Sequence, residues 1–108
     1  MKSNSVLLIG YVGQHLLEKT LPSGSRMTML RVATHHSWKD GDGNLKYTSV
    51  WHNVVAWDEE SVYAQRNFVK GSRILVEGMI LYRSYPDNKG YVRFSAEIKA
   101  TSLLNLDR

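Results

Sequence analysis

The chain has 108 residues, enough for one domain with a hydrophobic core and too few for two, so we treat residues 1–108 as a single domain. Its 43% hydrophobic and 22% charged residues exclude a disordered chain, and no apolar run approaches the roughly 20 residues that cross a bilayer. The lack of cysteine excludes disulfides and thiolate metal sites and fits a reducing, cytoplasmic location, while the net charge of +4 is compatible with a polyanionic partner.

Strand-like runs alternate with turn signals, and the apolar period changes once near the middle of the chain. The expected elements are strands over Ser5–Gly13, Met27–Trp38 and Leu45–Trp57, a helix over Asp58–Lys70, and strands over Arg73–Tyr85 and Tyr91–Leu104. This order matches the OB-fold, an all-β, five-stranded Greek-key barrel with one helix between strands 3 and 4. OB-folds bind oligonucleotides or sugars, so the function has to be argued from side chains.

Short-range signals support these elements. Gly10 and Gly13 permit the first strand to bend or bulge, as a strand of a small barrel must. The turn-forming residues 40–44 predict a hairpin between the second and third strands. Asp58 is placed to cap the helix N-terminus.

Aromatic rings beside cations are the feature that points to a function. Alternate residues share one face of a strand, so Trp51 and Trp57 are expected on one face, about 20 Å apart at about 3.3 Å per residue. Trp38 precedes Lys39 at a strand end and Tyr85 precedes a turn, which indicates exposed rings, although a tryptophan in a strand is more often buried. Any base can stack on such rings while cations follow the phosphates, so the pattern favours single-stranded nucleic acid bound with weak sequence preference.

Cations near the expected loops and rings are the best candidates for phosphate contacts. These candidates are Lys39, Lys70, Arg83, Lys89 and Arg93. Arg31, Arg73 and Lys99 lie on strand faces, where charges are usually just solvated. Phe94 belongs to an apolar alternation with Val92, Ala96 and Ile98, and this pattern predicts a core position for its ring.

Six short blocks together resemble the bacterial-type single-stranded DNA-binding protein, a family of OB-fold proteins. The blocks are Asn4-Ser-Val-Leu-Leu-Ile-Gly10, Pro22-Ser-Gly24, Val32-Ala-Thr34, Trp51-His-Asn-Val-Val55, Phe68-Val-Lys-Gly-Ser72 and Val76-Glu-Gly78. They occur in the family's order and near its spacing between about residues 4 and 106. The resemblance implies a homotetramer of OB-fold protomers that coats unpaired DNA in replication, repair or recombination, without catalysis or cofactor.

The resemblance also implies roles for single residues. The family's base-stacking aromatics fall on Trp38, Trp51, Trp57 and Tyr85. The last two replace rings that the family more often writes as Phe and Trp. Phe94 falls on an aromatic position of the family's last strand, which leaves the direction of its ring open. His52 falls near a subunit interface of the family, and an ordinary hydrogen-bonded histidine in a strand is equally compatible with its position.

The chain also departs from the family pattern. Asn53, Leu81 and Glu59 stand where the family has a cation, so fewer phosphates would be neutralised and binding would be weaker or less salt-dependent. The family usually continues into a disordered tail with an acidic, apolar tip that recruits other proteins, whereas this sequence stops at Asp107-Arg108. If these residues are the whole protein, tail-mediated recruitment of replication or repair proteins is not expected.

Two other functions compete with DNA coating. An enzyme with a metal site would start from His35-His36 and residues 40–44, but an EF-hand beginning at Asp40 would need Gly and Glu where the chain has Leu45 and Trp51. No nucleophile–base motif is evident either, so we expect no catalysis, metal or cofactor. The stronger alternative is a primosome-type OB accessory protein that acts mainly through protein contacts and is dimeric rather than tetrameric.

Overall fold

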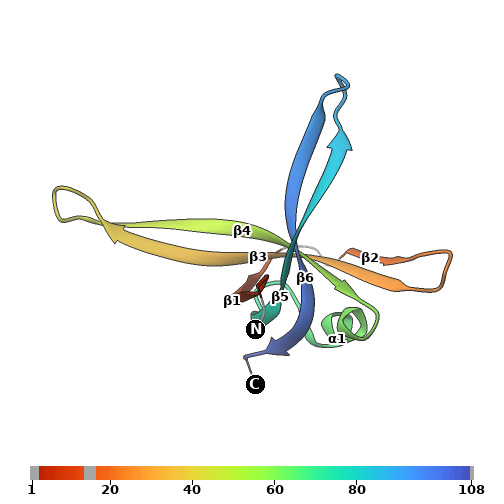
Figure 1. Ribbon diagram of the computed structural model, residues 1–108. Helices are drawn as coiled ribbons and strands as arrows, with labels where there is room; N and C mark the ends of the chain where they lie inside the picture. The colour runs from red at the N-terminus through yellow and green to blue at the C-terminus, as the bar shows by residue number, and fades with distance from the viewer. Residues whose placement is uncertain (1–2, 14–16, 108) are drawn as a thin grey trace.

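The computed structural model describes residues 3–13 and 17–107, which form six strands and one helix (Figure 1). The elements are β1 (Val6–Val12), β2 (Leu17–Thr20), β3 (Arg26–Lys39), β4 (Leu45–Trp57), α1 (Glu59–Asn67), β5 (Arg73–Pro86) and β6 (Val92–Asn105). Each predicted strand is present with bounds within one residue of the prediction or, for β4, identical to it. Within the described ranges, no helix has the length and apolarity needed to cross a membrane.

Pairing of β1 with two partners closes the sheet into a barrel. The strand order is β1-β5-β6-β4-β3-β2, and β1 also pairs with β3 at Tyr11↔Ala33 and one further position. β4 and β6 pair in parallel through a short contact that includes Val54↔Ile98. Five strands thus form a closed barrel, β2 lies outside it, and α1 connects the third barrel strand, β4, to the fourth, β5. The predicted OB-fold is confirmed.

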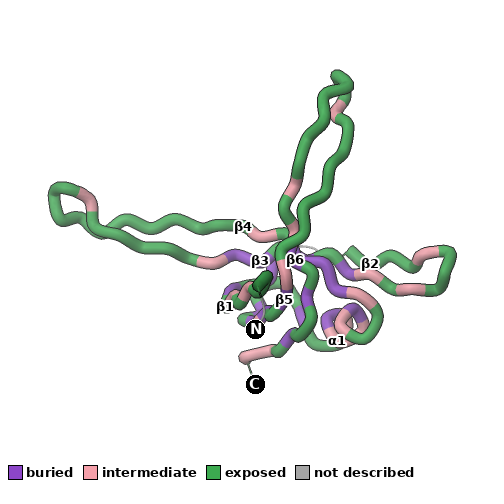
Figure 2. Tube along the Cα trace, in the orientation of Figure 1, coloured by how far each residue is buried: buried purple, intermediate pink, exposed green. Residues whose placement is uncertain are grey.

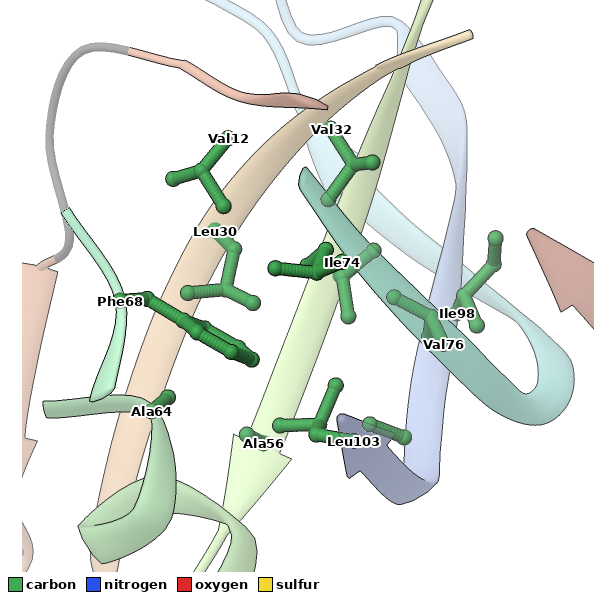
Figure 3. Close-up of a cluster of buried hydrophobic side chains, with 12 residues drawn as sticks. Val12, Leu30, Val32, Ala56, Ala64, Phe68, Ile74, Val76, Ile98 and Leu103 are labelled. Carbon is green, nitrogen blue, oxygen red and sulfur yellow. The ribbon is translucent and has the colours of Figure 1, made fainter. Parts of the chain in front are cut away.

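The hydrophobic core fills the inside of this barrel (Figure 3). Its members come from every barrel strand and from the helix region: Val12, Leu30, Val32, Val54, Ala56, Ala64, Phe68, Ile74, Val76, Ile98, Ala100 and Leu103. The even-numbered residues of β3, β4 and β5 supply half of this set, as the two-residue period of a strand requires. Ala64 of α1 and Phe68, which follows α1, cover the end of the barrel under the helix.

Two glycines allow barrel strands to approach one another very closely. A Cβ atom on Gly10 would collide with the carbonyl oxygen of Ala33, and one on Gly78 would collide with that of Lys99. The β5–β6 register also shifts between Glu77 and Gly78. The flexibility expected at Gly10 is therefore used for a close strand approach, and the recorded irregularity lies in β5.

Three local features differ from the predictions. β2 was not expected, because its residues Leu17–Thr20 are all exposed and show no apolar alternation. Asp58 lies at the N-cap of α1 with φ 50°, but its carboxylate accepts a hydrogen bond from the Arg26 N–H at 3.1 Å instead of capping the helix. α1 ends at Asn67, earlier than predicted, because Phe68 takes an extended conformation and enters the core.

Two hairpins continue far beyond the barrel as the β3–β4 arm, residues 35–50, and the β5–β6 arm, residues 80–97. They point away from the barrel in different directions and are exposed along almost their whole length (Figures 1 and 2). The radius of gyration, 16.0 Å, accordingly exceeds the about 13 Å typical of a compact domain of this size. The predicted core position of Phe94 is wrong: its ring is 74% exposed, because it lies on an arm with no second layer.

Replacing Ile74 by alanine should lower the free energy of unfolding by about 2–5 kcal/mol, because its fully buried side chain would leave a cavity in the core. Urea unfolding followed by tryptophan emission measures this loss. The matched control is Ile80→Ala in the same strand, where the side chain is 36% exposed and the loss should be much smaller. Equal losses in the two variants would contradict this placement of the core.

Candidate nucleic-acid interface

The outer surface of β3 and β4 carries two of the predicted rings. Trp51 and Trp57 lie on this surface as expected, because the even-numbered residues between them point into the barrel. Trp51 is 49% exposed and Trp57 is half-buried. Across the ladder, Met29 and Arg31 lie between the two rings, since they pair with Val55 and Asn53. We call the surface formed by Met29, Arg31, Trp51, Asn53 and Trp57 the barrel face.

The Trp51 ring is held in place from two sides. The Arg31 guanidinium lies over it, with Cζ 4.9 Å from the ring centroid, a contact worth about 0.5–1 kcal/mol at an exposed site. The ring edge rests on Gly13, where an added Cβ would lie 2.7 Å from Cζ3 of Trp51. The Gly13 N–H also donates to the Arg31 carbonyl at 2.7 Å, so the glycine and the arginine are fixed together.

Arg31 is the residue that the sequence analysis missed. It was interpreted as an ordinary solvated strand charge, yet its guanidinium lies over a predicted stacking ring. The signal lies in the register: Trp51 pairs with Ala33, so Arg31 occupies the diagonal position on the same face. That register was not available from the sequence.

Two surface hollows meet at Trp51. The first, of about 410 Å³, is lined by Leu17, Met29, Leu30, Arg31, Trp51, Asn53 and Val54. The second, of about 290 Å³, lies where β4 and β6 diverge and is lined by Val6, Leu8, Trp51, His52, Asn53, Ile80, Tyr82, Ala96, Glu97 and Ile98. Trp51 and Asn53 belong to both walls. A flat aromatic group bound at Trp51 therefore has largely apolar space on both sides.

The β5–β6 arm brings three predicted residues together on one face. Tyr85 pairs directly with Arg93, and Arg83 precedes it by two residues on the same strand face. Tyr85 is exposed, as predicted. Both cations are already engaged, because Arg83 contacts Glu97 at 3.0 Å and Arg93 contacts Asp87 at 2.9 Å. This face thus offers a ring with partly neutralised arginines.

Asp87 organises the turn that carries Lys89. Its Oδ1 accepts hydrogen bonds from the N–H groups of Lys89 and Tyr91, both at 2.9 Å, and its Oδ2 accepts one from Nε of Arg93. The hydrogen bond from Arg93 is the main cause that lowers the pKa of Asp87; partial burial opposes it, and the backbone N–H groups add to it. Because the pKa is lowered in the folded protein, the ionised carboxylate stabilises the turn above its ordinary pKa of 3.8, and this stabilisation is lost as the pH falls through the lowered value.

The β3–β4 arm carries Trp38 and Lys39 at its far end. Trp38 is exposed, as predicted, and stacks on His36 with ring centroids 5.7 Å apart. It pairs with Lys46, which places it on the face of the ladder opposite to that of Trp51. The turn residues 40–44 close the hairpin, because Oδ1 of Asp40 accepts hydrogen bonds from two backbone N–H groups. Among the described residues, no three His, Asp or Glu side chains are grouped to hold a metal.

Lys70 is exposed in the turn between α1 and β5, and this turn is attached to the end of β1. The N–H of the next residue, Gly71, donates to the carbonyl of Val12 at 2.9 Å. Lys70 therefore lies at the end of the barrel that also holds Gly13, the support of Trp51. The predicted residues thus occupy three places: the barrel face with Lys70 beside it, the tip of the β3–β4 arm, and one face of the β5–β6 arm.

The matches to known proteins agree with this arrangement of barrel, arms and rings. Residues 3–106 match the profile of the single-strand binding protein family. The chain belongs to this family. A curated relative, single-stranded DNA-binding protein 1 of Chlorobaculum tepidum, is 33% identical over 101 residues, which are 93% of this chain and 62% of the relative. The chain thus spans about three fifths of that relative's length.

Solved structures of the family share the fold. The protein of a Plasmodium falciparum complex with single-stranded DNA superposes with a TM-score of 0.88 and 28% identity, over 99% of this chain and 97% of that one. A small single-stranded DNA-binding protein from Streptomyces coelicolor gives 0.76 and 20%, over 97% of this chain and 95% of that one. A deletion mutant of the Thermus aquaticus single-stranded DNA-binding protein gives 0.82 and 22%, over 95% of this chain and half of the other.

Replacing Gly13 by alanine should displace the Trp51 ring, because the new methyl group would overlap its edge. We expect a changed near-UV circular dichroism spectrum and a loss of about 1–3 kcal/mol in the free energy of unfolding. The matched control is Gly41→Ala, where an added Cβ meets nothing within 4 Å and both quantities should stay near wild type. An unchanged spectrum in Gly13→Ala would refute the proposed support of the ring.

Replacing Arg93 by glutamine should raise the pKa of Asp87 toward its ordinary value of 3.8, because the main group that lowers it is removed. A carboxyl titration followed by NMR measures this midpoint. Arg83→Gln is the matched control: Arg83 pairs with Glu97, so the Asp87 midpoint should not move. An equal rise of the Asp87 pKa in both variants would show that the total positive charge of the arm, rather than the Arg93 contact, lowers this pKa.

Proposed function

We propose that this chain binds single-stranded DNA without strong sequence preference, by stacking bases on aromatic rings and contacting phosphates with cations. The observation that carries the proposal is the position of Trp51 in a member of this family. Its ring is half exposed, supported by Gly13 and Arg31, and flanked by a hollow on each side. A ring held this way keeps a stacking surface open while losing little freedom on binding.

Base stacking requires nothing more than flat rings that are accessible. Trp51 and Trp57 provide them on the barrel face, Trp38 on the β3–β4 arm and Tyr85 on the β5–β6 arm. Each stacked base contributes about 1–3 kcal/mol, and every base has a face that can stack. Weak sequence preference follows, because stacking does not distinguish the hydrogen-bonding edges of the bases.

Phosphate contacts are assigned to Lys39, Lys70, Lys89, Arg83 and Arg93. We add Arg31, because a base stacked on Trp51 would place its phosphate within reach of a guanidinium that already lies over the ring. Arg83 and Arg93 would contribute less than free cations, since each must share its charge with a carboxylate. The salt dependence of binding should therefore be shallower than the number of basic residues suggests.

Protection of unpaired DNA in replication, repair or recombination by a homotetramer in the cytoplasm is the biological role that we propose. The names of the relatives support its DNA-binding part, as does the Plasmodium structure, which is described as a complex with single-stranded DNA. Assembly is supported by Leu7, Ile9 and Tyr11, apolar side chains exposed in a row on the outer face of β1. Nε2 of His52 donates or accepts a hydrogen bond with Oγ1 of Thr34 at 2.9 Å, which gives this ring nitrogen a partner within the chain.

Titration with oligo-dT should quench tryptophan emission, because bases stack on the tryptophan rings. Trp51→Ala should weaken binding by about 1–3 kcal/mol on oligo-dT and on oligo-dC alike, whereas Trp51→Phe, which keeps a ring, should stay closer to wild type. Anisotropy of a labelled oligonucleotide measures affinity independently of quenching.

No binding of oligo-dT at low salt would contradict the DNA-coating role and favour the accessory role through protein contacts. A change in base preference in Trp51→Ala would show that the ring reads sequence. Thermal unfolding of each variant separates a lost contact from a lost fold.

A further inference from the structure

The β5–β6 arm has a second face, which bears no charge. Along it the register places Tyr82 opposite Ala96 and Ser84 opposite Phe94, whereas Arg83, Tyr85 and Arg93 project from the other side. Tyr82 is 75% exposed and Phe94 is 74% exposed. Neither ring contacts another aromatic ring in the described parts of the chain, so no ring competes with a base for either of them.

This second face, rather than the Tyr85 face, is joined to Trp51. The hollow of about 290 Å³ between the diverging strands has Trp51 on one wall and Tyr82 with Ala96 on the other. From Tyr82, the diagonal position across the ladder leads outward along the arm to Phe94. Three exposed rings thus follow one another from the barrel face onto the arm.

The distribution of charge favours the same route. The Tyr85 face carries the carboxylate of Glu97, paired with Arg83, and Asp87 stands at its outer end. A phosphate passing there meets negative charge beside each arginine, and like charges repel at close range. The residues of the second face are Ile80, Tyr82, Ser84, Pro86, Val92, Phe94 and Ala96, none of which is ionised. Glu97 borders the hollow at the start of this route, but outward from there bases that turn toward the second face bring no phosphate against a carboxylate.

We propose that Tyr82 and Phe94 form a second base-stacking site, which receives the bases that follow the one stacked on Trp51. The site rests on the proposed function and extends it, because it adds stacking on the second face of the β5–β6 arm to the stacking assigned to Tyr85 on the other face. Its ligand is single-stranded DNA, bound through bases and with little contribution from phosphates.

The test compares two double variants of the full chain. Tyr82→Ser with Phe94→Ser removes both rings, and Tyr82→Phe with Phe94→Tyr keeps both; all four changes are at exposed positions. The ligands are labelled oligo-dT of about 16 nucleotides, the upper end of the site size of one OB-fold, and a strand of the same length in which the outer half lacks bases. Anisotropy gives the affinity and tryptophan emission reports stacking at the barrel face.

We expect the serine variant to bind oligo-dT at least about fivefold more weakly for each ring lost and the ring-keeping variant to bind like wild type. Two half-abasic strands are compared, one with the missing bases at the 5′ end and one with them at the 3′ end. On the strand that wild type binds more weakly, the serine variant should have the same affinity as wild type, because the bases that would stack on Tyr82 and Phe94 are missing. Quenching at saturation should persist in both variants. This last result shows that the barrel face still binds.

Two results would overturn the proposal. Equal affinity of the serine variant and wild type for oligo-dT, with quenching intact, would remove the second site and leave the proposed function standing. A change in sedimentation of the free protein without a change in DNA affinity would show that the face contacts a second copy of the chain instead. Absence of binding and quenching in wild type itself would refute the proposed function.

Discussion

Close contact between strands at Gly10 and Gly78 is the constraint on which the rest of the structure depends. Each glycine faces a backbone carbonyl, of Ala33 and Lys99 respectively, and neither site has room for a Cβ atom. These approaches let β1 reach β3 and let β5 and β6 pair closely at their register shift, so five strands close around a core of small volume. Once the inner faces are used for that core, only the outer surface and the arms are available for a ligand.

The same device recurs at the candidate site. Gly13 lacks the side chain that would occupy the space of the Trp51 ring, so the ring lies against backbone and half of it faces solvent. An exposed tryptophan on a strand would otherwise sample several rotamers and lose that freedom on binding. Here the backbone and Arg31 hold the ring before a base arrives. The side-chain entropy of the ring is therefore lost when the protein folds and not when DNA binds. Gly10 of β1 and Gly13 just after it thus link the closure of the barrel to the presentation of the ring.

The alternation of residues along the strands predicted the fold well, but it did not predict how deeply each residue is buried. On β6, Ile98 and Phe94 lie on one face and both look like core residues, yet Ile98 is 7% exposed and Phe94 is 74% exposed. A two-residue period identifies a face, but the point where the barrel ends depends on where β4 pairs with β6, at Val54↔Ile98. That pairing joins residues far apart in sequence. β2 was missed because it only pairs along the edge of β3 and none of its own residues is buried.

The exposure of the candidate rings could be predicted from the sequence, whereas the pairing of the candidate cations could not, because the effect of a cation depends on its neighbours in the fold. Glu97 illustrates this: its side chain is 12% exposed, lies on the wall of the hollow beside Trp51 and holds Arg83 at 3.0 Å. If Arg83 turned to a phosphate, it would leave a carboxylate facing both Trp51 and the DNA backbone. We expect the ion pair to stay intact, because Arg83 is the one cation that forms an ion pair with this carboxylate among the described residues, and a largely buried carboxylate that loses its partner is costly. A strand bound between the arms is then held chiefly by its bases, and the direction it takes is set by where rings stand free of carboxylates.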